Sequence, residues 1–392
     1  MLVDRIAGRS PRPRGGSQTG MGGVRDGIHE AESEAEREAV FRFRYDIYVE
    51  EMDRYQGVAD HENRRLVEPE DEYSRLTYAA EGGAVVGTAR LSWGGLAPLP
   101  ERMIRQYGLA PFLAELPADA LAVGERAMIA PHLRGSDLLL EMMGRGIRFA
   151  NRNRIQLTFG NCEPHLLNLY LGLGHRPYSD DNVNSREAGY LIPLVFAAED
   201  FEHLRRIDSP LLEYASDFGA DARVPACLDR MLAEGSAVLS SRLTSRRSYW
   251  SEVHGALSEI GGKRFSALDG MSEAEAQRCL AKSNIIECDA GDRVLKKGGS
   301  ARNMFVVLDG TLEVRDGETP VATLGPGDVF GEVAFLLDRP RTMDVHATRN
   351  GARVLSLSES LVRGMIDDDA PVAAQLMLNV AKMLCVRLLR LE

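Results

Sequence analysis

A short segment in the last quarter of the chain combines residue types that bind phosphate and sugar groups. It begins with Phe330-Gly331-Glu332 and leads to Arg341. A helix that starts at this Gly-Glu pair presents backbone N–H groups without partners inside the helix, and such groups suit an anionic oxygen. The Glu332 carboxylate can accept hydrogen bonds from a sugar hydroxyl, and the planar Arg341 guanidinium matches a phosphate. These residue types indicate a ligand that carries both groups.

A second anion-binding pattern lies in the middle of the chain, where an expected strand meets an expected helix. The junction is Leu133-Arg134-Gly135-Ser136-Asp137, followed by Leu138. Free amides at the helix start can hold a phosphate, Gly135 allows close approach of the backbone, and Arg134 adds positive charge. An ordinary strand–loop–helix turn explains the same residues, so this motif by itself leaves both interpretations open.

The elements around this junction alternate between strands and helices. A helical pattern begins at Glu30, and residues 76–93 predict two strands around a Glu-Gly-Gly turn. We then expect a strand over residues 120–130, a loop and a helix over 131–151, and a strand over 154–161. A helix over 163–175 and a strand over 188–196 follow. Such alternation indicates an α/β layer architecture.

The pattern changes in the second half of the chain. Residues 216–262 show helical spacing of apolar residues and close with Gly261-Gly262, a signal for a helix end. From Lys263 onward, short strands with glycine-rich turns predict a small β-barrel or jelly roll. Asp309-Gly310 predicts a hairpin turn, and an amphipathic helix is expected over residues 371–391.

Composition excludes several classes of protein. A length of 392 residues predicts two or three domains, and 44% hydrophobic with 27% charged residues is typical of a soluble globular chain. No run of about 18 apolar residues predicts a membrane span, and residues 1–25 lack the apolar stretch of a secretory signal. Five cysteines without a CxxC pair argue against disulfides and a structural zinc, so we expect a cytoplasmic protein without a metal. The net charge of -11 argues against a nucleic-acid partner.

The segment from Phe330 to Val345 closely resembles the phosphate-binding cassette of cyclic nucleotide-binding domains, and the resemblance spans residues 266–392. It implies that Glu332 binds the ribose 2'-hydroxyl and that Arg341 binds the cyclic phosphate. Thr342 could contact either the phosphate or a guanine amino group, so we expect cyclic AMP as the effector and leave cyclic GMP open. The expected nucleotide site comprises Phe330, Gly331, Glu332, Val333, Ala334, Arg341 and Thr342.

Residues 29–215 resemble the GNAT acyltransferase fold in their order of elements and in the tyrosine that precedes Leu173-Gly174-His175-Arg176-Pro177. The resemblance implies that the loop Leu133, Arg134, Gly135, Ser136, Asp137 and Leu138 binds the pyrophosphate of coenzyme A or a phosphopantetheine arm. It also implies that Tyr170 protonates the leaving thiolate. Asp137 stands where a glycine is usual, and a carboxylate beside a pyrophosphate is unfavourable unless it points away. This departure leaves room for a carrier-protein donor with a single phosphate.

Residues 33–212 also resemble the acyl-homoserine lactone synthases and the long-chain N-acyl amino acid synthases, on Arg44 to Glu51, Asp71 and Val86 to Leu91. The resemblance implies an ion-pair network of Arg44, Asp71 and Arg90 around the acceptor site. The lactone synthases usually place a glutamate three residues before an arginine, whereas here Glu125 and Arg126 are adjacent. Because neighbouring residues of a strand point to opposite faces, we expect that these two do not face one pocket. An acylated amine is therefore expected rather than a lactone.

The family resemblance implies direct acyl transfer to an amine, which is nucleophilic only after it loses a proton. Glu125, directly or through water, is the expected base, and Tyr170 is the expected acid. Two simpler roles stay open, a strand-capping ion pair for Glu125 and a packing role for Tyr170. Cys162 and His165 are expected to be packing and surface residues rather than a nucleophilic pair, and His132 a loop residue.

We therefore expect a flexible arm (1–28), a GNAT-like N-acyltransferase domain (29–215), a helical linker (216–262) and an all-β cyclic nucleotide-binding domain with a C-terminal helix (263–392). The expected function is cyclic-nucleotide-regulated transfer of an acyl group from acyl-ACP or acyl-CoA to an amine, with an amino acid as the expected acceptor. The alternatives are a non-enzymatic sensor with a degenerate GNAT module and a cAMP-regulated protein lysine acetyltransferase. Acyl carrier protein and a second copy of the chain stay open as partners of this bacterial-looking protein. No helix-turn-helix follows the last helix, so we expect the acyltransferase to be the output of the sensor.

Overall fold

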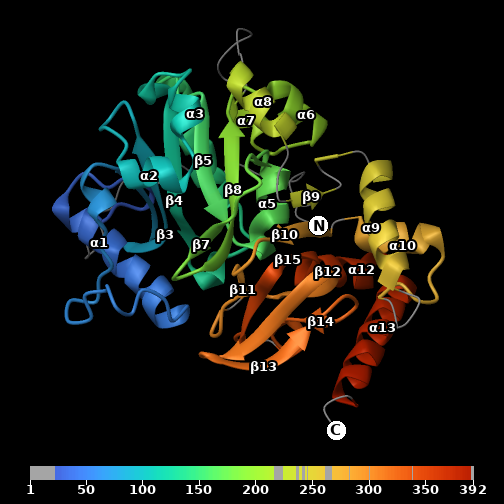
Figure 1. Ribbon diagram of the computed structural model, residues 1–392. Coiled ribbons are helices and arrows are strands. Elements are labelled where there is room, and N and C mark those ends of the chain that lie inside the picture. Colours follow the sequence, from blue (N-terminus) through green and yellow to red (C-terminus); the bar gives the residue numbers. More distant parts are fainter. Residues whose placement is uncertain are drawn as a thin grey trace. The chain divides into compact units, whose positions relative to one another are not determined.

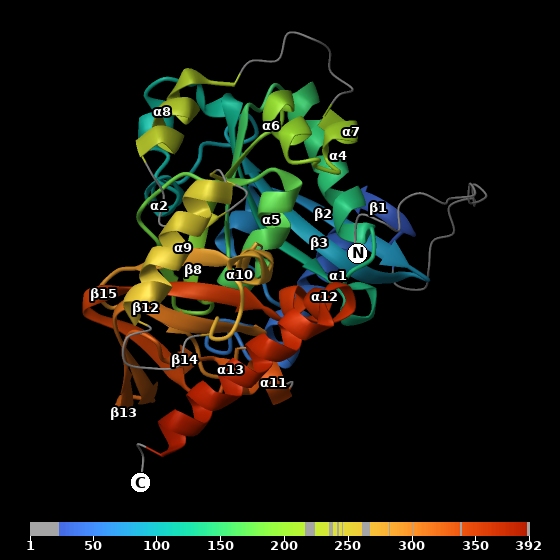
Figure 2. The same cartoon turned by 90° about the vertical axis from the view of Figure 1, so that its right-hand side faces the viewer.

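The computed structural model describes residues 23–215, 224–234, 238–240, 243–244, 246–260, 267–281, 283–299, 301–337 and 339–389. The chain divides into two compact units (Figures 1 and 2). The first comprises the chain up to Asn161, with Leu173–His175 and Leu194–Ala233. The second comprises Cys162–Gly172, Arg176–Pro193 and the chain from Glu234 onward.

The larger sheet has the order β1-β2-β3-β4-β5-β8-β6, and β7 pairs with β8. Neighbours are antiparallel from β1 to β4, whereas β4 and β5 run parallel over Leu121–Val123. The strands predicted over residues 76–93, 120–130, 154–161 and 188–196 are confirmed, and β1 begins inside the predicted arm, whose residues 1–22 lie outside the described part. The bounds are β1 (Gly27–Glu30), β2 (Arg75–Glu81), β3 (Ala84–Trp93), β4 (Leu121–Ile129), β5 (Leu157–Cys162), β6 (Arg176–Pro177), β7 (Val183–Ser185) and β8 (Gly189–Ala197).

Helices connect these strands, as the alternating pattern predicts. The first begins after Ser33, whose hydroxyl accepts a hydrogen bond from the Glu36 amide while the Glu36 carboxylate accepts one from the Ser33 amide. This reciprocal cap moves the helix start past Glu30, where β1 ends. The helices are α1 (Glu34–Tyr45), α2 (Glu101–Gln106), α3 (Ala110–Leu113), α4 (Leu138–Arg152), α5 (Leu167–Leu173), α6 (Phe201–Arg206), α7 (Leu212–Ala215) and α8 (Ala226–Glu234).

The second unit is rich in β-structure. Its sheet has the order β13-β12-β15-β10-β9, with β11 paired to β15 and β14 paired to β12 (Figure 1). The strands are β9 (Val238–Ser240), β10 (Asn284–Cys288), β11 (Arg293–Leu295), β12 (Asn303–Asp316), β13 (Thr319–Leu324), β14 (Val329–Phe330) and β15 (Asp344–Ser358). The helices are α9 (Arg246–Ile260), α10 (Glu273–Leu280), α11 (Glu332–Leu337), α12 (Glu359–Asp368) and α13 (Ala370–Leu388).

The core of the second unit joins its helices to its sheet. Val253 of α9, Leu376 of α13 and Leu355 of β15 are fully buried in one apolar cluster. The expected closing helix is confirmed as α13. Within the expected linker, Val238–Ser240 forms a strand rather than part of a helix, because it pairs with β10. Gly261 and Gly262 lie outside the described residues.

The hairpin predicted at Asp309-Gly310 is wrong. β12 runs through both residues without reversing, and β15 pairs with it on both sides of them. The register shifts between Val307 and Asp309 and again between Gly310 and Leu312. The glycine is therefore part of a β-bulge within one long strand. The reversal occurs later, at Gly317, where φ is 61°. Across the described residues, no helix has the length and apolar character needed to cross a bilayer.

Candidate functional site

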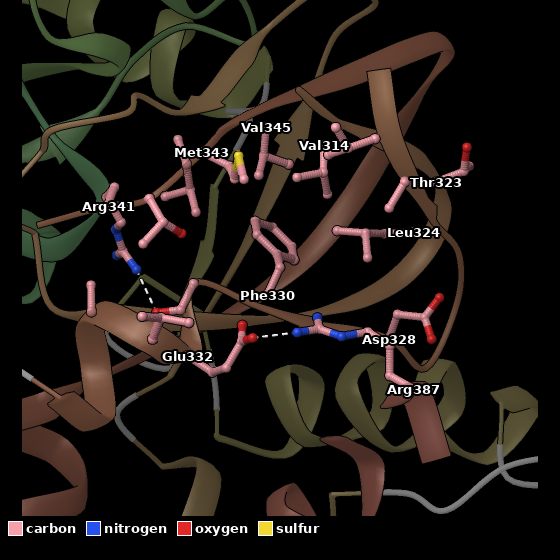
Figure 3. A pocket seen from close by; sticks show the side chains of 17 residues that line it. Val314, Thr323, Leu324, Asp328, Phe330, Glu332, Arg341, Met343, Val345 and Arg387 are labelled. Atoms are coloured by element: carbon pink, nitrogen blue, oxygen red, sulfur yellow. Dashed lines mark hydrogen bonds and ion pairs between the residues drawn. The ribbon is translucent and has the colours of Figure 1, made fainter. Parts of the chain in front are cut away.

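A cavity of about 560 Å³ opens in the second unit beside α11 (Figure 3). Pockets that bind small molecules commonly have volumes of about 300–1,000 Å³. Its wall includes all seven residues expected at the nucleotide site: Phe330, Gly331, Glu332, Val333, Ala334, Arg341 and Thr342. The sequence segment therefore folds around a space large enough for a nucleotide.

Apolar side chains form much of the cavity wall. Phe330 lies on β14 and stacks on Phe305 of β12, with ring centroids 4.9 Å apart. Leu324, Val345 and Met343 also face the cavity (Figure 3). A flat heterocycle would find an apolar surface here.

Arg341 is buried, with 4% of its surface exposed. Its two terminal nitrogens donate to the Gly331 carbonyl and to both the carbonyl and the side-chain oxygen of Asn303. These oxygens are all uncharged, and no carboxylate among the described residues contacts the guanidinium. Burial lowers the pKa of Arg341 to about 10, so at neutral pH the group is still a cation. Its Nε is buried, and no described residue accepts a hydrogen bond from it.

Gly331 is required for this packing. Its φ is +77°, and a Cβ at this position would lie 2.7 Å from Nη1 of Arg341. A side chain would therefore strain the backbone and displace the guanidinium. The glycine of the motif thus holds Arg341 close to the start of α11.

Glu332, the second expected ligand residue, forms an ion pair with Arg387 of α13 (Figure 3). Arg387 also donates to the Val329 carbonyl at 2.7 Å. A ribose hydroxyl must share the Glu332 carboxylate with this arginine or displace it. The sequence analysis missed Arg387 and Asn303, since neither belongs to the motif and each reaches the site through the fold.

The first unit contains a buried ion-pair network at the predicted acceptor site. Arg44 donates to Asp71 at 2.7 Å, and Arg90 donates to the same carboxylate oxygen at 3.1 Å. Arg90 also bonds Glu68 at 3.0 Å and Glu125 at 2.8 Å. Arg44, Asp71 and Arg90 are 0%, 1% and 2% exposed. The structure thus brings together the three residues that the family resemblance implied and adds Glu68, which the sequence analysis missed.

The prediction that Glu125 and Arg126 do not face one pocket is wrong. Arg126 has a φ of +56°, and the pairing of β3 with β4 shifts register beside it. This bulge breaks the alternation of side chains, so Arg126 bonds Glu68, the residue that also bonds Arg90. Both neighbours therefore join one network, and alternation no longer argues against a lactone product.

The network balances its charges. Its four cations face its four carboxylates: Arg44, Arg90, Arg102 and Arg126 pair with Glu68, Glu70, Asp71 and Glu125. Burial alone would raise the pKa of Glu68, but the bonds from Arg126 and the nearby guanidinium charges lower it to about 2. The charges of Glu125 and Glu68 outweigh burial at Arg90 and raise its pKa.

Glu125, the expected base, is held at both oxygens. Arg90 donates to one, and the hydroxyl of the buried Tyr107 donates to the other at 2.8 Å. Tyr107 follows α2 and was not identified from the sequence. The carboxylate is thus fixed in one orientation, with 12% of the side chain still exposed.

The expected donor loop lies between β4 and α4. Gly135 has a φ of +81°, and Asp137 stands at the N-cap of α4, where its side chain makes no capping hydrogen bond. Leu133 and Leu138 pack against an apolar cluster, and the Ser136 hydroxyl accepts from the Leu138 amide at 3.3 Å. Arg134 is already engaged, because both ends of its guanidinium bond Glu51 at 2.6 and 2.8 Å. A donor phosphate must compete with that carboxylate.

The remaining candidates lie in or beside short helices. Tyr170 lies on α5, within the second unit. Cys162 is buried, and burial raises the pKa of its thiol well above the usual value, which opposes a role as a nucleophile. His165 and His132 each lie in a short 3-10 turn. In the described part of the chain, no three histidine, cysteine or carboxylate side chains gather as a metal site would require.

Comparison with known proteins assigns the region around the cavity to a protein family. Residues 285–369 match the family model for the cyclic nucleotide-binding domain, so the chain carries a domain of this family there. The type II regulatory subunit of cAMP-dependent protein kinase from Drosophila melanogaster is 41% identical over 64 residues, which are 15% of this chain and 17% of that protein. The chain spans about a fifth of the length of the curated relatives it matches.

Two solved structures are similar to parts of the chain. A cyclic nucleotide-binding domain from Methylobacillus flagellatus covers 39% of this chain and 85% of its own, with 16% identity and a TM-score of 0.33. A CoA-dependent acyl-homoserine lactone synthase, BjaI, covers 53% of this chain and 97% of its own, with 20% identity and a TM-score of 0.37. Both TM-scores are low, so the site residues rather than these likenesses support the functional assignments.

Proposed function

We propose that this protein is an N-acyltransferase whose activity depends on a cyclic nucleotide. The observation that carries the nucleotide half is the buried Arg341, a cation on the cavity wall that no carboxylate of the described residues contacts. A phosphate would give this cation an anionic partner, and hydrogen bonds between charged groups contribute roughly 1.5–3 kcal/mol each. Cyclic AMP is the proposed effector, bound through its phosphate at Arg341 and its ribose at Glu332.

The proposed cyclic nucleotide-binding half comprises residues 263–392 and forms a jelly roll. The proposed acyltransferase half comprises residues 29–215, and its acceptor site lies at the network of Arg44, Asp71 and Arg90. A neutral charge balance suits an acceptor that is itself a zwitterion, because such a molecule brings one group of each sign. An amino acid is therefore the proposed acceptor.

The proposed reaction is direct transfer from a thioester. The amine nitrogen attacks the carbonyl carbon, a C–N bond forms, and Glu125 accepts the proton that the nitrogen loses. The C–S bond then breaks, and Tyr170 gives a proton to the leaving sulfur. Tyr107 and Arg90 each donate to a different oxygen of the Glu125 carboxylate, so the base is oriented before the acceptor arrives.

One contact favours a second candidate, a sensor in which the GNAT-like half does no chemistry. The bidentate bond between Arg134 and Glu51 occupies the arginine that would grip the phosphate of a donor. A permanent contact of this kind would exclude coenzyme A and the phosphopantetheine arm alike. The two candidates differ in whether a thioester is consumed.

The deciding experiment incubates the full chain with acyl-CoA or acyl-ACP and a panel of amino acids, with and without cyclic AMP. Products are identified by mass spectrometry, and free thiol is measured in parallel. We expect an N-acyl amino acid whose rate of formation changes with cyclic AMP. Cyclic AMP binding without any thioester consumption would overturn the enzyme and favour the sensor.

A further inference from the structure

The β7–β8 hairpin lies in the second unit, together with the cyclic nucleotide-binding domain. Its strands pair from Val183 with Leu191 to Ser185 with Gly189. We infer that this hairpin transmits nucleotide binding to the acyltransferase half, an inference that rests on the proposed function and specifies its regulation. Three features carry it: the bonds that hold the hairpin, the bonds that hold Arg341, and the path of β8.

Two cations of the nucleotide-binding domain hold the turn of the hairpin. The Arg293 guanidinium donates to the carbonyls of Ser185 and Arg186 at 3.0 and 2.7 Å. The Lys296 ammonium donates to the Glu187 carbonyl at 2.9 Å. Three successive carbonyls of the turn are thus bound by β11 and the residue that follows it.

The strands of the hairpin are bound as well. The Arg293 amide donates to the Asn184 side chain at 3.2 Å, and the Asn184 amide group donates to the buried Asp292. The Tyr190 hydroxyl donates to the Glu287 carbonyl at 2.6 Å. A Cβ at Gly189 would lie 3.1 Å from the Arg293 carbonyl oxygen, so the two backbones are in close contact. Closely packed contacts pass on a displacement instead of absorbing it.

The same segment also holds the arginine proposed to bind the cyclic phosphate. The Gly298 amide donates to the Arg341 carbonyl at 2.8 Å, and the Arg341 amide donates to the Gly299 carbonyl at 2.8 Å. Leu295, between Arg293 and Lys296, lines the cavity. One stretch, residues 293–299, therefore contacts the hairpin at its beginning and the backbone of Arg341 at its end.

β8 leads from the hairpin into the first unit. Its residues Gly189–Pro193 belong to the second unit, and Leu194–Ala197 belong to the first. The hairpin is itself part of the larger sheet, and a shift of it continues along the backbone of β8 into Leu194–Ala197 of the first unit. A phosphate that draws Arg341 to a new position would move residues 293–299 and, with them, the hairpin.

The test measures hydrogen exchange of peptides covering residues 183–193 in the full chain, with and without cyclic AMP, because exchange reports local opening without any need for an acyl donor. The variants are Arg293→Ala with Lys296→Ala, and Arg293→Lys, which keeps the charge on a shorter side chain that does not extend to the position of Nη2, the nitrogen that bonds both carbonyls. Lys297→Ala is the matched control, since Lys297 lies beside Lys296 but pairs with Asp316. Calorimetry gives the cyclic AMP affinity of every protein.

We expect cyclic AMP to change exchange of residues 183–193 in the wild type and in Lys297→Ala. In the double variant, cyclic AMP should still bind within about threefold of the wild-type affinity, while the change in exchange is lost. Arg293→Lys should give an intermediate change. The ratio of acyl-transfer rates with and without nucleotide should approach one in the double variant.

A double variant that binds cyclic AMP and keeps the full change in exchange would overturn the inference while leaving the proposed function intact. A wild type that fails to bind cyclic AMP would overturn the proposed function instead, and the calorimetry alone would show it. If circular dichroism shows that the double variant is unfolded, Arg293→Lys decides the question. If cyclic AMP changes its exchange as much as it does in the wild type, the inference is overturned, and a smaller change supports the inference.

Discussion

The nucleotide cavity and the acceptor network both bury arginines, but they neutralise them differently. Arg90 and Arg126 face carboxylates directly, and the pKa of each is raised despite burial, whereas burial lowers the pKa of Arg44 although it pairs with Asp71. Arg341 bonds only uncharged oxygens among the described residues, and burial lowers its pKa to about 10. The arginines of the network contact carboxylates, whereas no carboxylate of the described residues contacts Arg341 on the cavity wall.

This difference separates two uses of a buried charge. In the network, the carboxylates fix the arginines and orient Glu125, so the charges serve as a scaffold for an acceptor site. In the cavity, the Arg341 charge is free to be compensated by a ligand. An anion should therefore bind much more strongly at Arg341 than at Arg44 or Arg90.

Removing the uncompensated cation tests this difference most directly. Arg341→Ala should lower cyclic AMP affinity about 100-fold or more, because two charged hydrogen bonds of roughly 1.5–3 kcal/mol each are lost. The exposed Arg339→Ala serves as the control on the same loop. Calorimetry measures both, and an Arg341→Ala affinity within twofold of wild type would break the comparison.

The network should respond to substitution by losing stability. Glu68→Gln leaves Arg126 without its carboxylate and should cost roughly 3–5 kcal/mol at neutral pH. The folded-state pKa of Glu68 lies at about 2, below its ordinary 4.5, so this stabilisation is present above pH 4.5 and is lost as the pH falls through about 2. The difference in unfolding free energy between Glu68→Gln and the wild type should therefore shrink as the pH falls from 4.5 to about 2.

Urea unfolding followed by Trp93 fluorescence in a Trp250→Phe background reports on the first unit, since Trp93 lies on β3. The exposed Glu72→Gln is the control, and it should be unchanged. If Glu68→Gln and Glu72→Gln unfold at the same urea concentration at neutral pH, the role assigned to Glu68 is contradicted.

Tyr107→Phe asks whether orientation of Glu125 matters for catalysis. Loss of a hydrogen bond to a carboxylate, worth about 1.5 kcal/mol, should lower kcat for acyl transfer about tenfold, with a smaller change in KM. Cyclic AMP affinity should stay constant, which makes it an internal control. A change in KM alone would assign Tyr107 to acceptor binding instead.

The smallest effect is expected at the ion pair between Glu332 and Arg387. Arg387→Ala frees the carboxylate for the ribose, and because a partly exposed pair contributes up to about 1 kcal/mol, cyclic AMP affinity should rise about fivefold. Competition titrations with a fluorescent cyclic nucleotide measure the change. A loss of affinity would show that Arg387 contacts the nucleotide rather than competing with it.

The nucleotide segment could be predicted from sequence because its functional groups are close together in the chain. Phe330 to Thr342 contains the glycine, the acid, the arginine and the short helix, and local geometry brings them around one cavity. Sequence patterns also located most strands of both sheets and the closing helix. Periodicity is a local property, so these elements do not depend on distant contacts for their detection.

Only the tertiary structure decided how the charges pair. The partners of Arg134 and Arg341, which are Glu51 and Asn303, lie far from them in the chain, and Glu68 meets Arg126 across the fold. Arg126 joins the network because its backbone has a positive φ, which is uncommon for a residue other than glycine. The alternation of side chains along a regular strand does not predict such a conformation. Residue types and their spacing show which side chains can bind a phosphate, because those groups are close together in the chain. The fold fixes which of those charges already have a partner, because the partners lie far away in the sequence.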